Sequence, residues 1–178
     1  RLHIRRNDEN IGGIANTSKA VRNSEDADYI LFCLDKDKIN KQHLSSFIDF
    51  LENTKPHSGY IELYPTKEIS DYRFFQAGIE ATKYTSFLSK HPSGFFWKRE
   101  EMETYLKRIS DPISISFPFW MDILQGYFAY NHGSYIVYLP LITHAPYREE
   151  YMKNRPRTLT YNNDNIYFSC KQRIEAFN

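Results

Sequence analysis

Apolar and polar residues follow two periods along this chain, and together they predict alternating strands and helices. Short apolar runs bounded by turn residues predict strands, whereas apolar residues at i, i+3, i+4 and i+7 predict helices with one buried face. The predicted strands cover residues 1–6, 29–34, 60–64, 95–97 and 135–139. The predicted helices cover residues 14–23, 40–51, 69–79, 100–109 and 120–130.

The apolar run at 29–34 has the strongest influence on the expected fold. Its six residues show no alternation, which is typical of a strand covered on both faces of its sheet. With the strand and helix predicted before it, this run completes a βαβ unit, and such units build parallel sheets. We therefore expect one α/β domain, with a mostly parallel sheet flanked by helices, over residues 1–144. Residues 145–178 are expected to form a polar, tyrosine-rich tail.

Composition narrows the classes of function. The 178 residues carry 23 basic and 22 acidic side chains, a net charge of +1. Because nucleic-acid-binding proteins usually have a marked basic excess, we expect no nucleic-acid partner. The two cysteines do not form a disulfide framework, and Cys33 is expected to act as a small buried hydrophobe. Without a signal-peptide pattern or an apolar stretch of ~20 residues, a cytoplasmic location is expected.

Two aspartates directly follow the apolar run. Asp35 and Asp37 are separated by Lys36, and residues two apart on an extended chain point to the same side. Ligands of wound α/β sheets bind at the carboxyl ends of the strands, and carboxylate oxygens suit Mg²⁺ or Mn²⁺. The pattern therefore indicates a cation site. A solvent-exposed turn is the alternative, because Asp-x-Asp is common.

Three segments resemble the family 2 glycosyltransferases, which have the GT-A fold. NIGGIANTSKAVRNSEDADYILFCLDKD at 10–37 is similar to the family's Asn-x-Gly loop, short helix, acidic entry, apolar strand and Asp-x-Asp. HPSGFFWKRE at 91–100 is similar to its strand of glycine and aromatic residues, which ends in a basic residue. FPFWMDILQGYFAYNHGSYIVYLPLITH at 117–144 is similar to its late helix with a catalytic acid, followed by a strand and Leu-Pro. The resemblance implies a GT-A-like, Rossmann-type fold.

The resemblance also implies an activity. Enzymes of this family are inverting and metal-dependent, and they move a sugar from a nucleotide-diphosphate donor to a hydroxyl acceptor. The implied cofactor is Mn²⁺ or Mg²⁺, and the implied acceptor is a glycan or a lipid-linked acceptor. The implied process is bacterial surface polysaccharide biosynthesis, of a capsule, an O-antigen or a lipooligosaccharide.

The resemblance assigns nucleotide-sugar binding to two segments. Asn10, Gly12 and Gly13 would shape the loop beside the nucleotide, because glycine lets the backbone approach a ligand closely. A tight turn before a helix is an equally good explanation of the two glycines. Asp35 would lie near the ribose, with Lys36 beside it.

Metal binding and the base involve three other positions. By the resemblance, Asp37 would bind the metal that bridges the diphosphate, with Asp35 as a further candidate ligand. His144, just past the last predicted strand, is a candidate metal or phosphate ligand because neutral imidazole suits Mn²⁺, and a structural histidine is the alternative. Asp122 is the candidate general base, which takes a proton from the acceptor hydroxyl. A helix-surface aspartate is the alternative for Asp122, since the family usually has two acids there. His57, His91 and His132 are expected in loops.

Two further expectations concern the ends of the sequence. The tail at 147–157 interleaves aromatic and basic residues, so it is a candidate for covering the active site or for peripheral contact with an anionic membrane surface. A solvated tail is the alternative. The family's first strand, helix and strand do not precede Arg1, and we therefore expect the sequence to be a fragment.

Two other functions remain open at this stage. A non-catalytic carbohydrate-binding or scaffold domain of the same fold would account for the single late acid. A sugar-nucleotide pyrophosphorylase shares the sheet architecture, but its glycine-rich signature would belong to the segment before Arg1.

Overall fold

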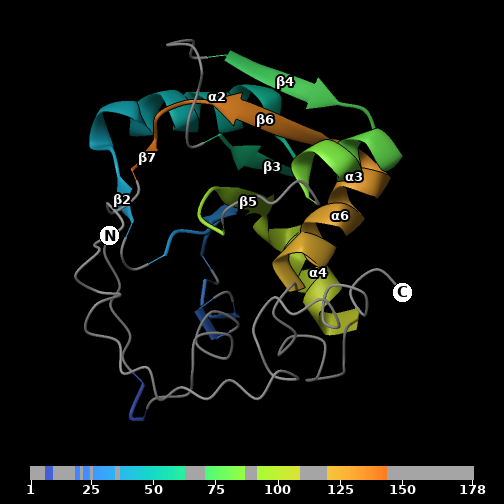
Figure 1. Ribbon diagram of the computed structural model, residues 1–178. Helices are drawn as coiled ribbons and strands as arrows, with labels where there is room; N and C mark the ends of the chain where they lie inside the picture. Colours follow the sequence, from blue (N-terminus) through green and yellow to red (C-terminus); the bar gives the residue numbers. More distant parts are fainter. Residues whose placement is uncertain are drawn as a thin grey trace, which may run out of the picture.

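The structure is a computed structural model of the 178-residue chain. It describes residues 7–9, 19–20, 22–24, 26–34, 37–62, 71–86, 92–108 and 120–143. Figure 1 shows its helices and strands. In chain order they are β1 (Tyr29–Leu31), β2 (Lys38–Ile39), the 3-10 helix η1 (Lys41–His43), α2 (Leu44–Thr54), β3 (Ser58–Ile61), β4 (Asp71–Phe75), α3 (Ile79–Thr85), β5 (Phe95–Lys98), α4 (Arg99–Arg108), α6 (Trp120–His132), β6 (Ser134–Tyr138) and β7 (Ile142–Thr143).

The main sheet has five strands in the order β1-β5-β3-β6-β4. β3 and β6 pair in parallel, whereas β1–β5, β3–β5 and β4–β6 are antiparallel pairs. The mixed α/β class is therefore confirmed, but a mostly parallel sheet is not observed. The physical reason is that β1, β3 and β6 do run in one direction, as βαβ connections require, while β5 is inserted between β1 and β3 in the opposite direction. β4 is added, also reversed, at the outer side of β6.

Helices cover both faces of this sheet. Successive residues of a strand point to opposite faces, so Phe96 and Tyr135 share one face and Ser134 lies on the other. The ring of Phe50 in α2 lies 6.0 Å from that of Phe96 and 5.4 Å from that of Tyr135. On the opposite face, Gln125 of α6 donates a hydrogen bond to Ser134. The result is a three-layer arrangement, with α2 on one face and α6, packed against α3, on the other.

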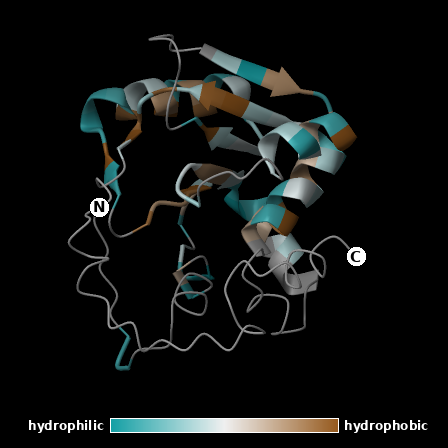
Figure 2. Ribbon diagram, viewed as in Figure 1, coloured by the Kyte–Doolittle hydropathy of each residue, from teal (hydrophilic) through white to brown (hydrophobic). Residues whose placement is uncertain are grey.

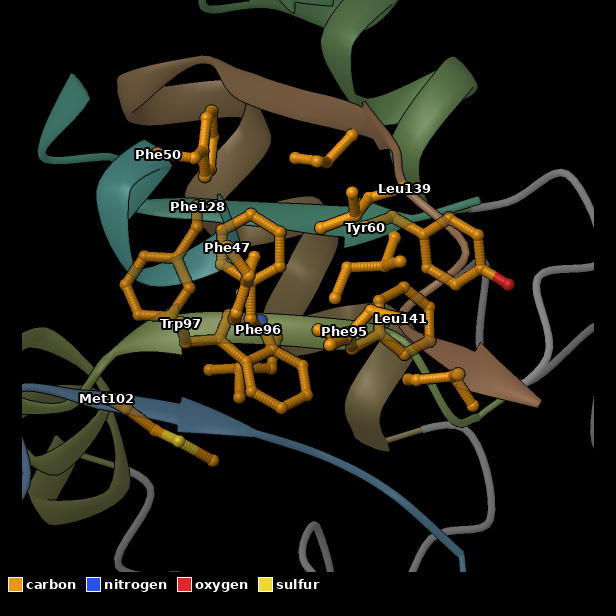
Figure 3. Packing of buried hydrophobic residues seen from close by; sticks show 14 residues of the cluster. Phe47, Phe50, Tyr60, Phe95, Phe96, Trp97, Met102, Phe128, Leu139 and Leu141 are labelled. Carbon is orange, nitrogen blue, oxygen red and sulfur yellow. The ribbon is translucent and has the colours of Figure 1, made fainter. Parts of the chain in front are cut away.

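Large aromatic side chains dominate the core. Figure 3 shows them packed together across β3 and β5, with side chains from α2 and α6. Phe95, Phe96 and Trp97 are at most 1% exposed, so the expectation that this triplet belongs to the core is confirmed. Burial of each such side chain is worth about 1.5–3 kcal/mol. In Figure 2, β6 is hydrophobic over its forward half, whereas α2 mixes hydrophilic and hydrophobic turns, as expected for a helix with one exposed face.

The sheet depends on a close approach at Gly59. A Cβ atom built there would lie 2.2 Å from Cζ of Phe96 and 2.8 Å from the carbonyl oxygen of Tyr135. The Phe96 ring thus occupies the space above Gly59 on the α2 face. Only glycine leaves room for this contact.

The helix predicted at 69–79 is wrong, and the helix predicted at 40–51 buries a different face from the one expected. Residues 71–75, inside the helix predicted at 69–79, form β4 instead, and α3 begins only at Ile79. The run Asp71–Phe75 is rich in aromatic residues that favour strands, and pairing with β6 decides its conformation. In α2, Phe47 and Phe50 are buried, while Leu44 and Ile48 of the predicted face are exposed.

The other predictions agree within a few residues where the structure describes them. β3 begins two residues before its predicted start, and β1 ends three residues before its predicted end. α4, α6, β5 and β6 lie where they were expected. The predicted strand at 1–6 and the tail at 145–178 lie outside the described residues, as does most of the predicted helix at 14–23. None of the described helices is long and apolar enough to cross a membrane.

Candidate functional site

The turn after β1 contains Asp37 and lies at the carboxyl end of that strand. The Asp37 N–H donates to the Leu34 carbonyl at 3.0 Å, which closes the turn. Ser93, just before β5, accepts from the Leu34 N–H at 2.9 Å and donates to Oδ2 of Asp37 at 2.5 Å. Ser93 is fully buried and Asp37 is only 8% exposed. The Asp37 carboxylate is thus a fixed, buried group rather than part of a solvated turn.

The small sheet of β2 and β7 lies next to this turn. β2 pairs with β7 in antiparallel register, with Lys38 opposite Thr143 and Ile39 opposite Ile142. The Asn40 N–H also donates to the Leu141 carbonyl at 2.7 Å. The residues immediately after Asp37 are therefore held against 141–143, a segment about a hundred residues later in the chain.

Cys33 lies beside the same turn and is partly buried rather than fully buried as expected. Its Sγ donates to the Leu34 carbonyl at 3.6 Å. Burial raises the pKa of the Cys33 thiol, and the nearby Asp37 carboxylate raises it further, while a hydrogen bond with Ser93 lowers it. This thiol is consequently a poor nucleophile at neutral pH.

Asp122 lies in the first turn of α6, where it was expected. It is half-buried, and burial raises the pKa of its carboxyl to about 7, against the lowering effect of its own backbone N–H. Its carbonyl accepts a hydrogen bond from Ser86, the residue that follows α3, at 2.6 Å. Asp122 is thus not an ordinary surface aspartate. Its pKa is that of a group able to take up a proton near neutral pH.

The Asp37 carboxylate accepts a hydrogen bond from Ser93, just before β5, whereas the Asp122 carbonyl accepts one from Ser86, just after α3. Figure 1 shows that α6 ends beside the start of β6. Asp122, in the first turn of α6, therefore lies at the opposite end of that helix from β6. The remaining predicted site residues lie outside the described residues: Asn10, Gly12, Gly13, Asp35, Lys36 and His144.

A surface cleft of ≈ 310 Å³ lies between α2 and the outer strands of the sheet. One wall is the polar face of α2, and the other combines Tyr72 of β4 with the end of β6. The lining residues are Ser46, Asp49, Phe50, Asn53, Thr54, Tyr72, Val137 and Leu139. An aromatic ring beside several hydroxyl, amide and carboxylate groups is a surface that suits a sugar.

Sequence reasoning missed a cluster at the opposite, amino end of β3 and β6. His57 precedes β3, Glu101 lies in the first turn of α4, and His132 is the last residue of α6. The Nδ1 atom of His57 hydrogen-bonds Oε1 of Glu101, and the rings of His57 and His132 stack at 4.4 Å. His57 and His132 were expected in loops, and for His132 this is wrong. Nothing in the sequence joins these residues, because they meet only through the fold.

The chain was compared with models of protein families, with curated proteins and with solved structures, and none of the three comparisons finds a match.

Proposed function

We propose that this chain is a nucleotide-sugar-dependent glycosyltransferase, with its active site at the carboxyl ends of β1 and β6. The observation that carries the proposal is the pairing of β2 with β7. Asp37 directly precedes β2 and His144 directly follows β7, so this pairing supports the idea that two distant candidate metal-binding segments serve one site. Ligand sites of wound α/β sheets lie at this end of the strands.

Asp122 is assigned the role of general base. Transfer to a hydroxyl requires that a proton leave the acceptor oxygen as it attacks the anomeric carbon, and the Asp122 carboxylate would accept that proton. A base is most effective when its pKa lies near the working pH, and the pKa of about 7 fits that requirement. The half-buried position at the start of α6 supplies the cause of the shift.

The carboxylate of Asp37 fits a hard divalent cation by its chemistry. Mn²⁺ and Mg²⁺ prefer oxygen ligands, and the hydrogen bond from Ser93 fixes the orientation of this carboxylate. Asp37, with Asp35 and His144, would hold the ion. When bound, such an ion neutralises charge on a departing nucleoside diphosphate.

A non-catalytic carbohydrate-binding domain is the second candidate, and the cleft beside α2 favours it. That cleft offers Tyr72 and the polar groups of α2 to a sugar without any need for Asp37 or Asp122. The two functions differ in their dependence on metal and on nucleotide. A catalytic site requires both, whereas a sugar-binding cleft requires neither.

The test is a screen of donors by thermal unfolding. The chain is melted with UDP-, GDP-, CMP- and dTDP-sugars, with and without Mn²⁺, and then the Asp37→Asn variant is melted with the best donor. We expect Mn²⁺ to strengthen donor binding to the wild type and to have little effect on the variant. Asp49→Asn is the matched control, because Asp49 is an exposed aspartate of the α2 cleft.

The outcome decides between the candidates. Stabilisation by free glycans that is lost in Asp49→Asn, with no response to any nucleotide sugar, would favour the carbohydrate-binding domain. Donor binding that is equally Mn²⁺-dependent in wild type and Asp37→Asn would remove Asp37 from the metal site.

A further inference from the structure

The cluster of His57, Glu101 and His132 is chemically independent of the proposed transferase site. The three residues come from three separate segments of the chain, and His57 and Glu101 are 44 residues apart. One ligand atom from each lies within 4.8 Å of the other two. Two imidazoles and one carboxylate form a ligand set that Zn²⁺ uses in proteins, with a water molecule in the fourth position.

The hydrogen bonding of the Glu101 carboxylate is a second, independent observation. Its Oε1 atom bonds His57, but its Oε2 atom is buried and has no hydrogen-bond partner in the part of the chain that the structure describes. A buried carboxylate oxygen without a partner is costly, and in native proteins such a group often marks a water or an ion. The Glu101 carboxylate is thus suited to take a cation as a further partner.

We propose that His57, Glu101 and His132 form a zinc-binding site that joins the start of β3, the start of α4 and the end of α6. A metal bound by imidazole lies in the plane of the ring, and the rings of His57 and His132 are stacked with an interplanar angle of 13°. One ring must therefore turn when the ion binds. His132 is exposed and ends its helix, so its side chain has room to turn.

Lys98 competes with a cation for this site. Its Nζ lies 3.9 Å from Oε1 of Glu101 and 3.9 Å from Oε2 of Glu100, and its side chain is 40% exposed. An ammonium group at that distance repels a divalent ion. Removing it should strengthen metal binding, which is the opposite of the effect of removing a ligand.

The experiment is a Zn²⁺ titration of the metal-free 178-residue chain against a chromophoric chelator, followed by thermal unfolding with and without Zn²⁺. We expect the cluster to bind one Zn²⁺ and, at a hundredfold excess over the Kd of this site, a rise in Tm of about 5–10 °C. His132→Ala and Glu101→Gln should weaken binding by at least about 100-fold, more than the loss of an outer partner does. Lys98→Met should tighten binding several-fold.

Two controls separate this site from others. His43→Ala removes a partly exposed histidine of η1 and should bind Zn²⁺ as the wild type does, whereas Asp37→Asn alters the proposed transferase site and should keep the Zn²⁺ binding that His132→Ala loses. Melting of each metal-free variant checks that it is folded, and the exposed position of His132 makes His132→Ala the safest ligand variant. Absence of Zn²⁺ binding by the wild type, or undiminished binding by both ligand variants, would overturn the proposal.

Discussion

The carboxyl and amino ends of β1, β3 and β6 are closed by different kinds of contact. At the carboxyl end, backbone hydrogen bonds link the segments after β1 and β6 to their neighbours, and Ser93 donates a hydrogen bond to the Asp37 side chain. At the amino end, side chains make the connections: Ser58 and Gln125 both donate to Ser134, and His57 bonds Glu101. The first arrangement is made largely by the backbone, whereas the second uses side chains to fix the helices to the sheet.

The largest effect is expected from Asp122→Asn. If Asp122 is the base of the proposed transferase, turnover should fall by ~10²–10⁴-fold, because asparagine keeps the shape of the side chain but takes no proton. Donor affinity should change little, since a base acts in the transition state. Steady-state kinetics with the best donor check both quantities. Full turnover in the variant would return Asp122 to a structural role.

A glycine lies near each end of β1, β3 and β6, so equivalent substitutions can be compared at the two ends. Gly94, at the carboxyl end, has φ +116°, and a Cβ there would lie 2.8 Å from the Ile61 carbonyl oxygen; Gly133, at the amino end, has φ +78°, and its Cβ would lie 2.6 Å from the Phe75 carbonyl oxygen. Alanine at either position should lower the free energy of unfolding by about 3 kcal/mol. Urea unfolding measures this cost.

The ligand response should separate these two variants. Gly94→Ala moves the segment that carries Ser93, so it should also weaken Mn²⁺-dependent donor binding, measured well below the Tm. Gly133→Ala should leave donor binding unchanged among folded molecules. Equal losses of donor binding in both variants would show that the two ends are not independent.

A smaller loss of stability is expected at the amino end from Ser134→Ala. The Ser134 hydroxyl oxygen accepts from Gln125 at 2.8 Å and from Ser58 at 3.2 Å, and all three residues are buried. Its removal leaves two buried donors unpaired and should cost about 1–3 kcal/mol. Gln125→Met should cost less, because it also removes Oε1 of Gln125, which already has no hydrogen-bond partner among the described residues. Denaturant unfolding of both variants checks the order.

The smallest effect concerns the pH dependence of stability. The pKa of Asp122 is raised to about 7, so the fold favours the protonated carboxyl. Its stabilising contribution is complete below pH 4 and is lost as the pH rises through about 7. Partial exposure limits this loss to about 1–2 kcal/mol. Asp122→Asn should remove it and be the more stable protein at pH 8; identical pH profiles of unfolding in wild type and variant would contradict the shift.

Sequence reasoning worked where local signals agreed. α4, α6 and β5 have strong periodic or apolar patterns, and Asn40 caps η1 through a hydrogen bond from the Gln42 N–H, as its residue type predicts. Sequence reasoning failed where pairing with a distant segment decides the secondary structure or the strand order. β4 carries a residue spacing that also fits a helix, and only its pairing with β6 makes it a strand. The insertion of β5 between β1 and β3 likewise has no local signal.

The features of the candidate site were likewise predictable only where they depend on neighbouring residues. The positions of Asp37 after a strand and of Asp122 on a helix could be predicted from neighbouring residues. The hydrogen bond from Ser86 to the Asp122 carbonyl and the one from Ser93 to the Asp37 carboxylate could not, because each joins residues more than thirty positions apart in the chain. The contact between His57 and Glu101 was unpredictable for the same reason.

The reactivity of the Cys33 thiol depends on the charge of the neighbouring Asp37 carboxylate. The Asp37 carboxylate contributes to the raised pKa of this thiol, and alkylation proceeds through the thiolate. A cation that binds to Asp37 would cancel that contribution, so Cys33 should then react faster at a given pH. In a Cys170→Ser background, the rate of alkylation would thus report occupancy of the site before any substrate is known.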